Sequence, residues 1–256
     1  MFVEATGFLL DLVFFGIFMA LVLNGSERRQ RVERYQEEIQ DFKRWNSEEG
    51  RMRIAGAVRR LVGMGKTDID FTGIKLTSFS FCNNDIKSIR GSRFYQGEWG
   101  NLSSREQVEL DSVDFGFIDC SKVIFSPGNP LQGLLLPPPV TIKDCRFPDA
   151  NLRGAVFNGA LLAWTDPPPS SLYEVVDTDD AGEPSFAQSV LAPFDRADLT
   201  GASFRDVQFV NADFRHVTNI LDADFSGAIG LDRVEFDDDE TKQHVIRQST
   251  RTSGQA

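Results

Sequence analysis

Residues 192–216 read APFDR ADLTG ASFRD VQFVN ADFRH, which is five consecutive units of five residues. The middle residue of each unit is large and apolar, and four of the five units begin with alanine. A period of five matches neither the 3.6 residues of an α-helix nor the 2 residues of a β-strand. It suits a coil that turns a corner every five residues and directs one large and one small side chain inward on each side.

The same spacing recurs in earlier parts of the chain and accounts for much of the unusual count of 22 phenylalanines. The large positions of the four runs, with one late addition, are Phe71, Leu76, Phe81, Ile86; Leu110, Phe115, Cys120, Phe125; Phe147, Leu152, Phe157, Leu162; Phe194, Leu199, Phe204, Phe209, Phe214; and Phe225. Stacked coils of this kind share one continuous core, so each coil depends on its neighbours.

Three of the units carry a more specific signature: ANLRG at 150–154, ADLTG at 197–201 and ADFRH at 212–216. They resemble the pentapeptide-repeat family, whose pattern is A(D/N)(L/F)xx. The resemblance covers roughly residues 68–236. It implies a mainly β fold, a right-handed quadrilateral β-helix with about four repeats per coil, and therefore about four and a half coils here. Some members of this family mimic duplex DNA and act on DNA gyrase.

Three stretches interrupt the repeats within the predicted β-helix of residues 67–236, at 90–106, 126–143 and 163–190. The second and third contain runs of three prolines. Proline cannot donate a hydrogen bond to a sheet ladder, so we expect these stretches to leave the coil at its corners. They are recognition loops on a rigid scaffold, or surface insertions that the fold tolerates.

Residues 5–23 read ATGFLLDLVFFGIFMALVL, a run of 19 residues with a single charge at Asp11. The run is long enough to predict a transmembrane helix. A cleaved signal peptide and a buried helix of a soluble protein are the alternatives. Asp11 is a tolerated polar residue or a contact between helices. Four arginines follow the run, so the positive-inside rule predicts a single-pass protein of the cell membrane, with its N-terminus outside and the bulk of the chain in the cytoplasm.

Residues 27–66 are predicted to form a helical stalk and an N-terminal cap. Val32, Tyr35, Ile39 and Phe42 form an apolar stripe at helical spacing. Residues 46–49 look like a break with a new N-cap, followed by a second helix that ends at Gly63. The arginines of that helix (Arg51, Arg53, Arg59 and Arg60) contact lipid headgroups or form a solvated face.

The last residues of the chain have two expected roles. Apolar residues of the 229–236 region (Ile229, Leu231, Val234 and Phe236) are candidates for closing the far end of the coil. Residues 237–256 are predicted to be an acidic and polar tail, partly disordered.

No catalytic, cofactor-binding or metal-binding residues are predicted. His216 and His244 lie in no hydrolase or zinc motif. Cys120 and Cys145 fall at inward positions, whereas Cys82 is alone and outward. Residues 63–67 end in Gly-Lys-Thr but lack the spacing of a phosphate loop, and the acidic run at 237–240 lacks the glycine turn of a calcium loop. The chain is therefore predicted not to be an enzyme.

The charge is unevenly distributed. Residues 1–66 hold 11 bases and 9 acids, whereas residues 67–256 hold 16 bases and 29 acids, and the net charge is −11. This argues against direct binding to nucleic acid. The predicted function is a membrane-anchored cytoplasmic scaffold that binds a protein partner, with homo-oligomerisation left open. The alternative is an acidic DNA mimic that inhibits or protects a DNA-handling enzyme such as gyrase.

Overall fold

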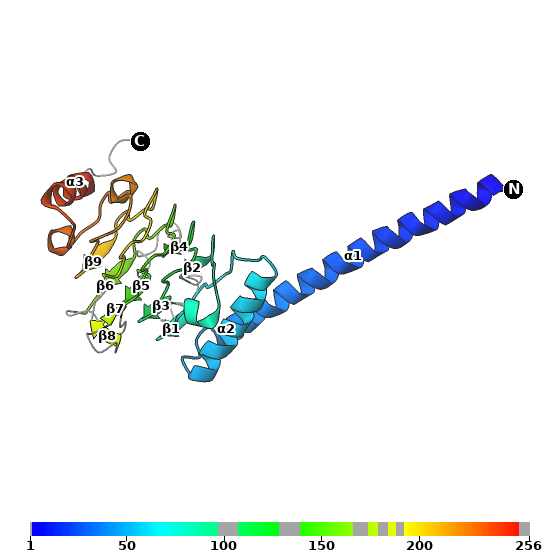
Figure 1. The fold of residues 1–256 in the computed structure, drawn as a ribbon, viewed down its shortest axis with the longest axis horizontal. Helices are drawn as coiled ribbons and strands as arrows, with labels where there is room; N and C mark the ends of the chain where they lie inside the picture. Colours follow the sequence, from blue (N-terminus) through cyan, green and yellow to red (C-terminus); the bar gives the residue numbers. More distant parts are fainter. Residues whose placement is uncertain are drawn as a thin grey trace, which may run out of the picture.

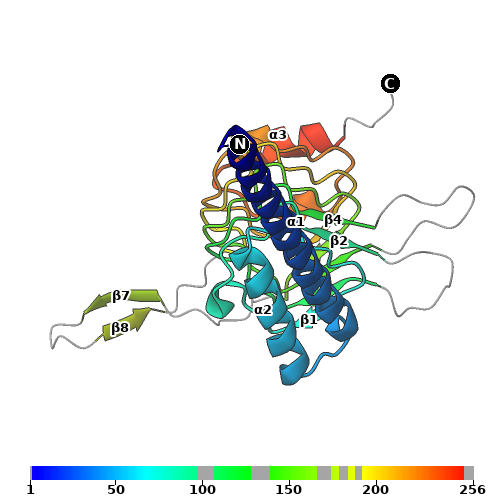
Figure 2. The same ribbon diagram turned by 90° about the vertical axis from the view of Figure 1, so that its right-hand side faces the viewer.

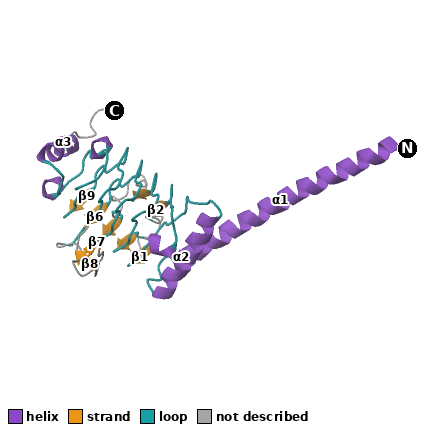
Figure 3. Ribbon diagram, viewed as in Figure 1, coloured by secondary structure: helices purple, strands orange, loops and turns teal. Residues whose placement is uncertain are grey.

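The computed structural model describes residues 2–96, 107–127, 139–165, 174–178, 184–187 and 192–250. Its centre is a rod of stacked coils, with helices at both ends (Figures 1 and 3). The α-helices of the described residues are α1 (Phe2–Phe42), α2 (Glu48–Gly63) and α3 (Asp239–Ser249). The strands are β1 (Lys75–Thr77), β2 (Arg93–Tyr95), β3 (Glu109–Asp111), β4 (Ile124–Ser126), β5 (Thr141–Lys143), β6 (Leu161–Ala163), β7 (Glu174–Thr178), β8 (Pro184–Ala187) and β9 (Gln208–Val210).

Successive coils pair through parallel ladders, one for each side of the rod. The β1 face contains β1, β3, β5, β6 and β9 in that order. The β2 face contains β2 and β4, and single parallel bridges continue it. Two further faces consist of bridges alone, and we name them the Asp114 face (Ser80, Asp114, Arg146, Asp213, Glu235) and the Asp119 face (Ser88, Asp119, Asn151, Asp198, Thr218). The pentapeptide spacing therefore produces a β-helix-like coil with parallel sheets, as predicted.

Two opposite columns of phenylalanine fill the coil. On the β2 face, successive rings stack with centroids 4.7 to 5.0 Å apart: Phe71, Phe94, Phe125, Phe157, Phe204 and Phe225. The Asp114 face carries the matching column of Phe81, Phe115, Phe147, Phe194, Phe214 and Phe236. Rings of the two columns meet edge to face, as Phe115 and Phe125 do at 5.8 Å. Both geometries are favourable for aromatic rings.

The coil also runs through segments that the repeat spacing assigned to insertions. β2 lies within 90–106 and β5 lies within 126–143. As a result, the ladder of the β1 face has six described rungs, from Lys75 to Ile229, where repeat counting predicted about four and a half coils. Phe94 lies eight residues after Ile86 and therefore breaks the period of five. Ile142 lies five residues before Phe147, so it extends the third run, which the repeat count began one unit too late.

Much of the three predicted insertions lies outside the described residues. Within the third, β7 and β8 form an antiparallel hairpin with a bulge between Val175 and Asp177. Figure 2 shows this hairpin projecting from the side of the rod.

The prediction of a single-pass membrane protein is wrong. Residues 5–23 are not a separate span but part of α1, which continues without a break into the charged sequence up to Phe42. A span needs about 20 consecutive apolar residues. Among the described residues, no helix is long and apolar enough to cross a membrane. The membrane location and topology predicted from residues 5–23 are therefore not supported.

The end of α1 and the whole of α2 cover the first coil. Ser47 caps α2 by accepting a hydrogen bond from the Gly50 N–H at 3.1 Å, which confirms the predicted break. A side chain at Gly50 would overlap the Trp45 backbone, so this turn requires glycine. Apolar residues of both helices are buried in the same core as the coil: Ile39, Ile54, Val58 and Leu61.

The far end of the coil is covered by α3, where the sequence predicted a polar tail. Asp238 caps this helix by accepting from the Thr241 N–H at 2.7 Å. Val245 is buried, and Ile246 packs beside it. The helix is short and has only these two core contacts, so its apolar signal is too weak to stand out in the sequence. Residues 251–256 lie outside the described residues.

Candidate functional site

The outer surface of the rod is where the chain can act, because its interior is filled by packed side chains. Strand residues before and after each inward position face outward, and corner residues adopt a positive φ. Most corners use Gly, Asp, Asn or Ser, which tolerate this conformation. Phe117, Lys122, Arg196 and His216 are bulkier corner residues at φ 55–60°. The corners thus display large side chains at defined positions.

Arginine–carboxylate pairs tie neighbouring coils together along the Asp114 face. Arg196 donates to both oxygens of Asp149, through Nε at 2.8 Å and Nη2 at 2.7 Å. Arg215 pairs with Asp213 at 2.6 Å and reaches Glu235 of the next coil at 3.4 Å. Two-pronged contacts of this kind are the strongest surface ion pairs.

His216, singled out in the sequence, lies in the middle of this network. Its Nδ1 lies 2.9 Å from Oδ1 of Asp195, a carboxylate that is buried although the imidazole is exposed. Asp195 Oδ2 accepts no hydrogen bond in the described structure, but lies 2.9 Å from Arg196 Nη1. No hydroxyl or thiol of the described residues hydrogen-bonds to the His216 ring. The arrangement connects two coils, and it lacks the nucleophile that a hydrolytic triad requires.

The Asp119 and β2 faces hold their acids in local turns. Burial would raise the pKa of Asp198, but hydrogen bonds from Thr200 and Asn219 outweigh it and keep the pKa below its ordinary value. For Asp224 the opposing hydrogen bonds come from Ser226 and Arg205, and the result is again a lowered pKa. Hydrogen bonds to the ionised form favour it. These carboxylates are therefore charged structural acceptors.

The three cysteines divide as the spacing predicted. Cys82 is exposed, whereas Cys120 and Cys145 are buried in the core. Burial raises the pKa of the Cys120 thiol, and the nearby charge of Asp119 adds to the effect. The pKa of Cys145 is likewise raised, mainly by burial. Neither buried thiol is a nucleophile, since reactivity requires the thiolate.

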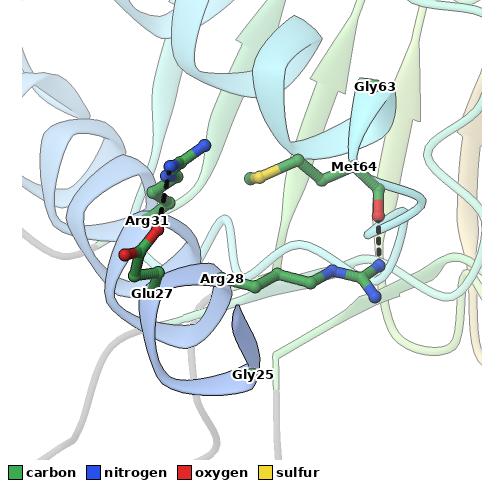
Figure 4. Close-up of a pocket in the computed structure, with 6 residues that line it drawn as sticks. All are labelled: Gly25, Glu27, Arg28, Arg31, Gly63 and Met64. Atoms are coloured by element: carbon green, nitrogen blue, oxygen red, sulfur yellow. Dashed lines mark hydrogen bonds and ion pairs between the residues drawn. The ribbon is translucent and has the colours of Figure 1, made fainter. Parts of the chain in front are cut away.

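The Gly-Lys-Thr sequence of residues 65–67 follows the end of α2, where Gly63 and Met64 line a cavity of about 530 Å³. Figure 4 shows Arg28 of α1 reaching across this cavity to donate to the Met64 carbonyl at 2.5 Å. Arg31 pairs instead with Glu27 on its own helix at 3.3 Å. Lys66 pairs with Asp68 at 2.7 Å. Arg28 therefore binds the carbonyl end of α2, whereas Arg31 and Lys66 are paired with carboxylates. This arrangement is not that of a phosphate loop.

The remaining predicted groups do not assemble into a chemical site. His244 lies exposed on α3, far along the chain from the other histidine. Asp238 is used as a helix cap. Within the described part of the chain, no cluster of three His, Cys, Asp or Glu side chains could hold a metal ion.

Comparison with known proteins gives a match to one family model and likenesses to 11 solved chains. The family model for pentapeptide repeats matches residues 192–229 in eight copies. No curated protein matches the sequence. Full-length QnrB1, a plasmid-mediated fluoroquinolone resistance protein, is 17% identical with a TM-score of 0.27, and the match covers 66% of this chain and 63% of QnrB1.

A trypsin-treated, singly substituted form of QnrB1 is 16% identical with a TM-score of 0.19, and the match covers 70% of this chain and 83% of that one. This chain therefore spans less than two thirds of full-length QnrB1. The family model identifies residues 192–229, in the C-terminal part of the rod, as a pentapeptide-repeat segment.

Proposed function

We propose that this chain is a non-catalytic scaffold that binds another protein through the outer faces of its rod. The observation that carries the proposal is the pairing of surface acids with arginines of neighbouring coils. Arg146 lies against Asp114, Arg196 against Asp149, and Arg215 against Glu235. A surface of alternating charges on a rigid backbone suits recognition of a specific protein surface, since mixed charges fix register and exclude wrong partners.

The alternative function, mimicry of duplex DNA, is less well supported by this pattern. A DNA mimic needs uncompensated negative charge along one face at the spacing of phosphates. Here Arg153 also lies 3.5 Å from Asp198, and Arg205 hydrogen-bonds to Asp224. Because basic groups interleave with the acids on three faces, the rod offers little uniform negative potential. We infer a protein partner, with no direct binding to nucleic acid.

The proposed organisation follows the predicted one. Residues 27–66 serve as the stalk and N-terminal cap, and residues 67–236 as the binding rod. We propose that the coil is right-handed, in keeping with the strong preference of parallel crossovers. The interruptions of the coil, including the β7–β8 hairpin, add recognition loops to its sides.

Affinity capture with the full chain in cells, followed by purification of the complex, tests this function. We expect one protein to bind the wild type. Binding should fall at least tenfold when Glu235 and Arg153, both exposed, are replaced by residues of opposite charge, while circular dichroism shows the same fold. A DNA supercoiling assay with purified gyrase tests the alternative. Inhibition or protection of gyrase, without a captured partner, would replace the scaffold by the DNA mimic.

A further inference from the structure

The first part of α1, residues 2–24, projects beyond the end of the rod, as Figure 1 shows. The later part of the same helix is fixed to the first coil. Ile39 is buried in the core, and Gln36 and Gln40 donate to the Asp70 carbonyl at 2.7 and 3.0 Å. In the projecting part, a Cβ added at Gly16 would meet no atom within 4 Å. The rod therefore holds a helical segment out into open space.

Large apolar side chains of this projecting segment are exposed. Exposed fractions are 61–68% for the phenylalanines and 38–57% for the others, and the residues are Phe14, Phe15, Phe18, Ile17, Met19 and Leu23. The run of residues 5–23 to which they belong contains one charge, at Asp11. A continuous exposed apolar surface of this kind marks a site of interaction.

The exposed side chains point in several directions around the helix axis. Each residue of an α-helix is rotated by about 100° from the one before it. Phe14 and Phe18 therefore lie on one side, Phe15 lies about a quarter turn away, and Leu23 lies about half a turn from Phe14. A single neighbouring helix covers only one of these sides. A helix that is apolar all round is normally buried on all sides, so this segment needs several apolar neighbours.

The exposed apolar area fits an assembly of three or more copies of this chain. A large aromatic side chain carries roughly 150–250 Å², so the six partly exposed side chains present roughly 600 Å² on each copy. Three copies bring together about 1,800 Å², which lies within the range of about 1,200–2,000 Å² that specific interfaces bury. Two copies that meet along one side would bury about half of 1,200 Å², which is less than that range.

Charges that follow the apolar segment allow identical helices to approach one another. Arg28 is turned back to its own body, where it donates to the Met64 carbonyl at 2.5 Å. Arg31 pairs with Glu27 of the same helix at 3.3 Å, and Figure 4 shows both contacts. Because these two arginines have partners within their own chain, they oppose the approach of a second copy less than free cations would. A closed assembly of identical chains also covers the apolar segment of every copy equally.

We propose that residues 2–24 of α1 pack against the same segment of other copies, in a bundle of at least three chains. The bundle covers the exposed phenylalanines. It lies beyond the end of the rod, so the outer faces of each rod stay accessible (Figure 1). Several rods are then held at one point, and linked binding sites hold a partner with repeated sites more tightly than a single site does. The bundle forms whichever partner the rods bind.

Sedimentation of the purified full chain, in buffer without detergent, tests the proposal. We expect the wild type to have the mass of at least three chains. Phe14→Glu combined with Phe18→Glu should raise the dissociation constant at least hundredfold, because the bundle would bury the added carboxylates. Met52→Glu, at an exposed apolar position of α2, is the matched control and should leave the mass unchanged. Circular dichroism should show the same fold in every variant.

Photochemical cross-linking locates the contact. The photoreactive residue p-benzoylphenylalanine replaces Phe15, and in the control it replaces Met52. After irradiation, we expect an adduct between copies at position 15, located by mass spectrometry within residues 2–24, and none at position 52. A wild type with the mass of one or two chains or with no defined mass, an equal loss of mass in Met52→Glu, or an adduct outside α1 would each overturn the proposal. Monomers that float with phosphatidylcholine vesicles would overturn it too, because lipid would then cover the segment.

Discussion

At the scale of single residues, each inward side chain stacks on its equivalents in the coils above and below. Phe147 lies between Phe115 and Phe194, with ring centroids 4.9 and 5.0 Å away. It is fully buried, whereas Phe117, two residues after Phe115, is 60% exposed. The burial of a phenylalanine therefore depends on its position within the unit of five.

Replacing Phe147 by alanine should lower the free energy of unfolding by about 3–5 kcal/mol, because it removes transfer energy and leaves a cavity. Phe117→Asn is the control. It should change stability by only about 0.5 kcal/mol, since the ring is exposed and asparagine tolerates a positive φ. Urea unfolding monitored by circular dichroism measures both. Equal effects of the two substitutions would contradict the stacked core.

Burial also predicts the reactivity of the three thiols. Only Cys82 should react with a thiol reagent in the native protein, because the raised pKa and burial of Cys120 and Cys145 suppress their thiolates. Titration with Ellman's reagent should find one equivalent in buffer and three in urea. Rapid reaction of a second thiol in buffer would show that the coil opens locally.

At the scale of elements, the helices α1, α2 and α3 cover the two open ends of the coil. A β-helix exposes unpaired peptide groups and apolar core at each terminus. Glutamine side chains are suited to this position, because one amide both donates and accepts, as a peptide group does. Gln36 and Gln248 each make this paired contact, at opposite ends of the β2 face.

Gln248→Ala should leave the Phe225 N–H and the Ala223 carbonyl without partners and cost roughly 1–3 kcal/mol. Hydrogen exchange at Phe225 should accelerate, since α3 then detaches more readily. Gln243→Ala, at an exposed position of the same helix, serves as the control and should change neither quantity. Unchanged exchange at Phe225 in Gln248→Ala would mean that α3 is held by Val245 alone.

At the scale of the whole molecule, the coils behave as a stack in which each rung depends on its neighbours. Ionised aspartates contribute to that stack by accepting hydrogen bonds within and between coils. The pKa values of Asp198 and Asp224 are below their ordinary value of 3.8 in the folded chain. A carboxyl whose pKa is lower in the folded state stabilises the protein above its unfolded pKa, and this stabilisation is lost as the pH falls through the folded value.

The free energy of unfolding should therefore be constant with respect to these two groups at neutral pH and should fall below about pH 3.8. In Asp198→Asn the fall should be smaller, because one of the two contributions is already absent. Unfolding measured between pH 2 and pH 7 for both proteins tests this. An acid dependence that is the same in both would exclude Asp198 as a contributor.

Several features were predictable from the sequence. The period of five placed most of the inward phenylalanines, though not Phe94. The residues around Ser47 indicated the cap of α2, and the inward positions of Cys120 and Cys145 predicted their burial. Each depends on spacing within a few residues. Other predictions failed where local pattern and context disagree. Residues 5–23 are apolar enough to suggest a separate span, yet they belong to a longer helix. Val245 and Ile246 alone give α3 too little apolar signal.

The sequence by itself determined that the chain forms a coil. Large and small inward residues alternate and recur every five positions, and this local spacing makes the chain turn a corner after each unit. What only the tertiary structure decided is how the coils stack. Arg93 and Ile124 pair across 31 residues, and Leu161 and Gln208 pair across 47. The period of five does not fix these separations in sequence, because an insertion of any length can leave the coil at a corner and return to it there. The partner of each rung and the ion pairs between coils, such as Arg196 with Asp149, follow from contacts between residues distant in the chain.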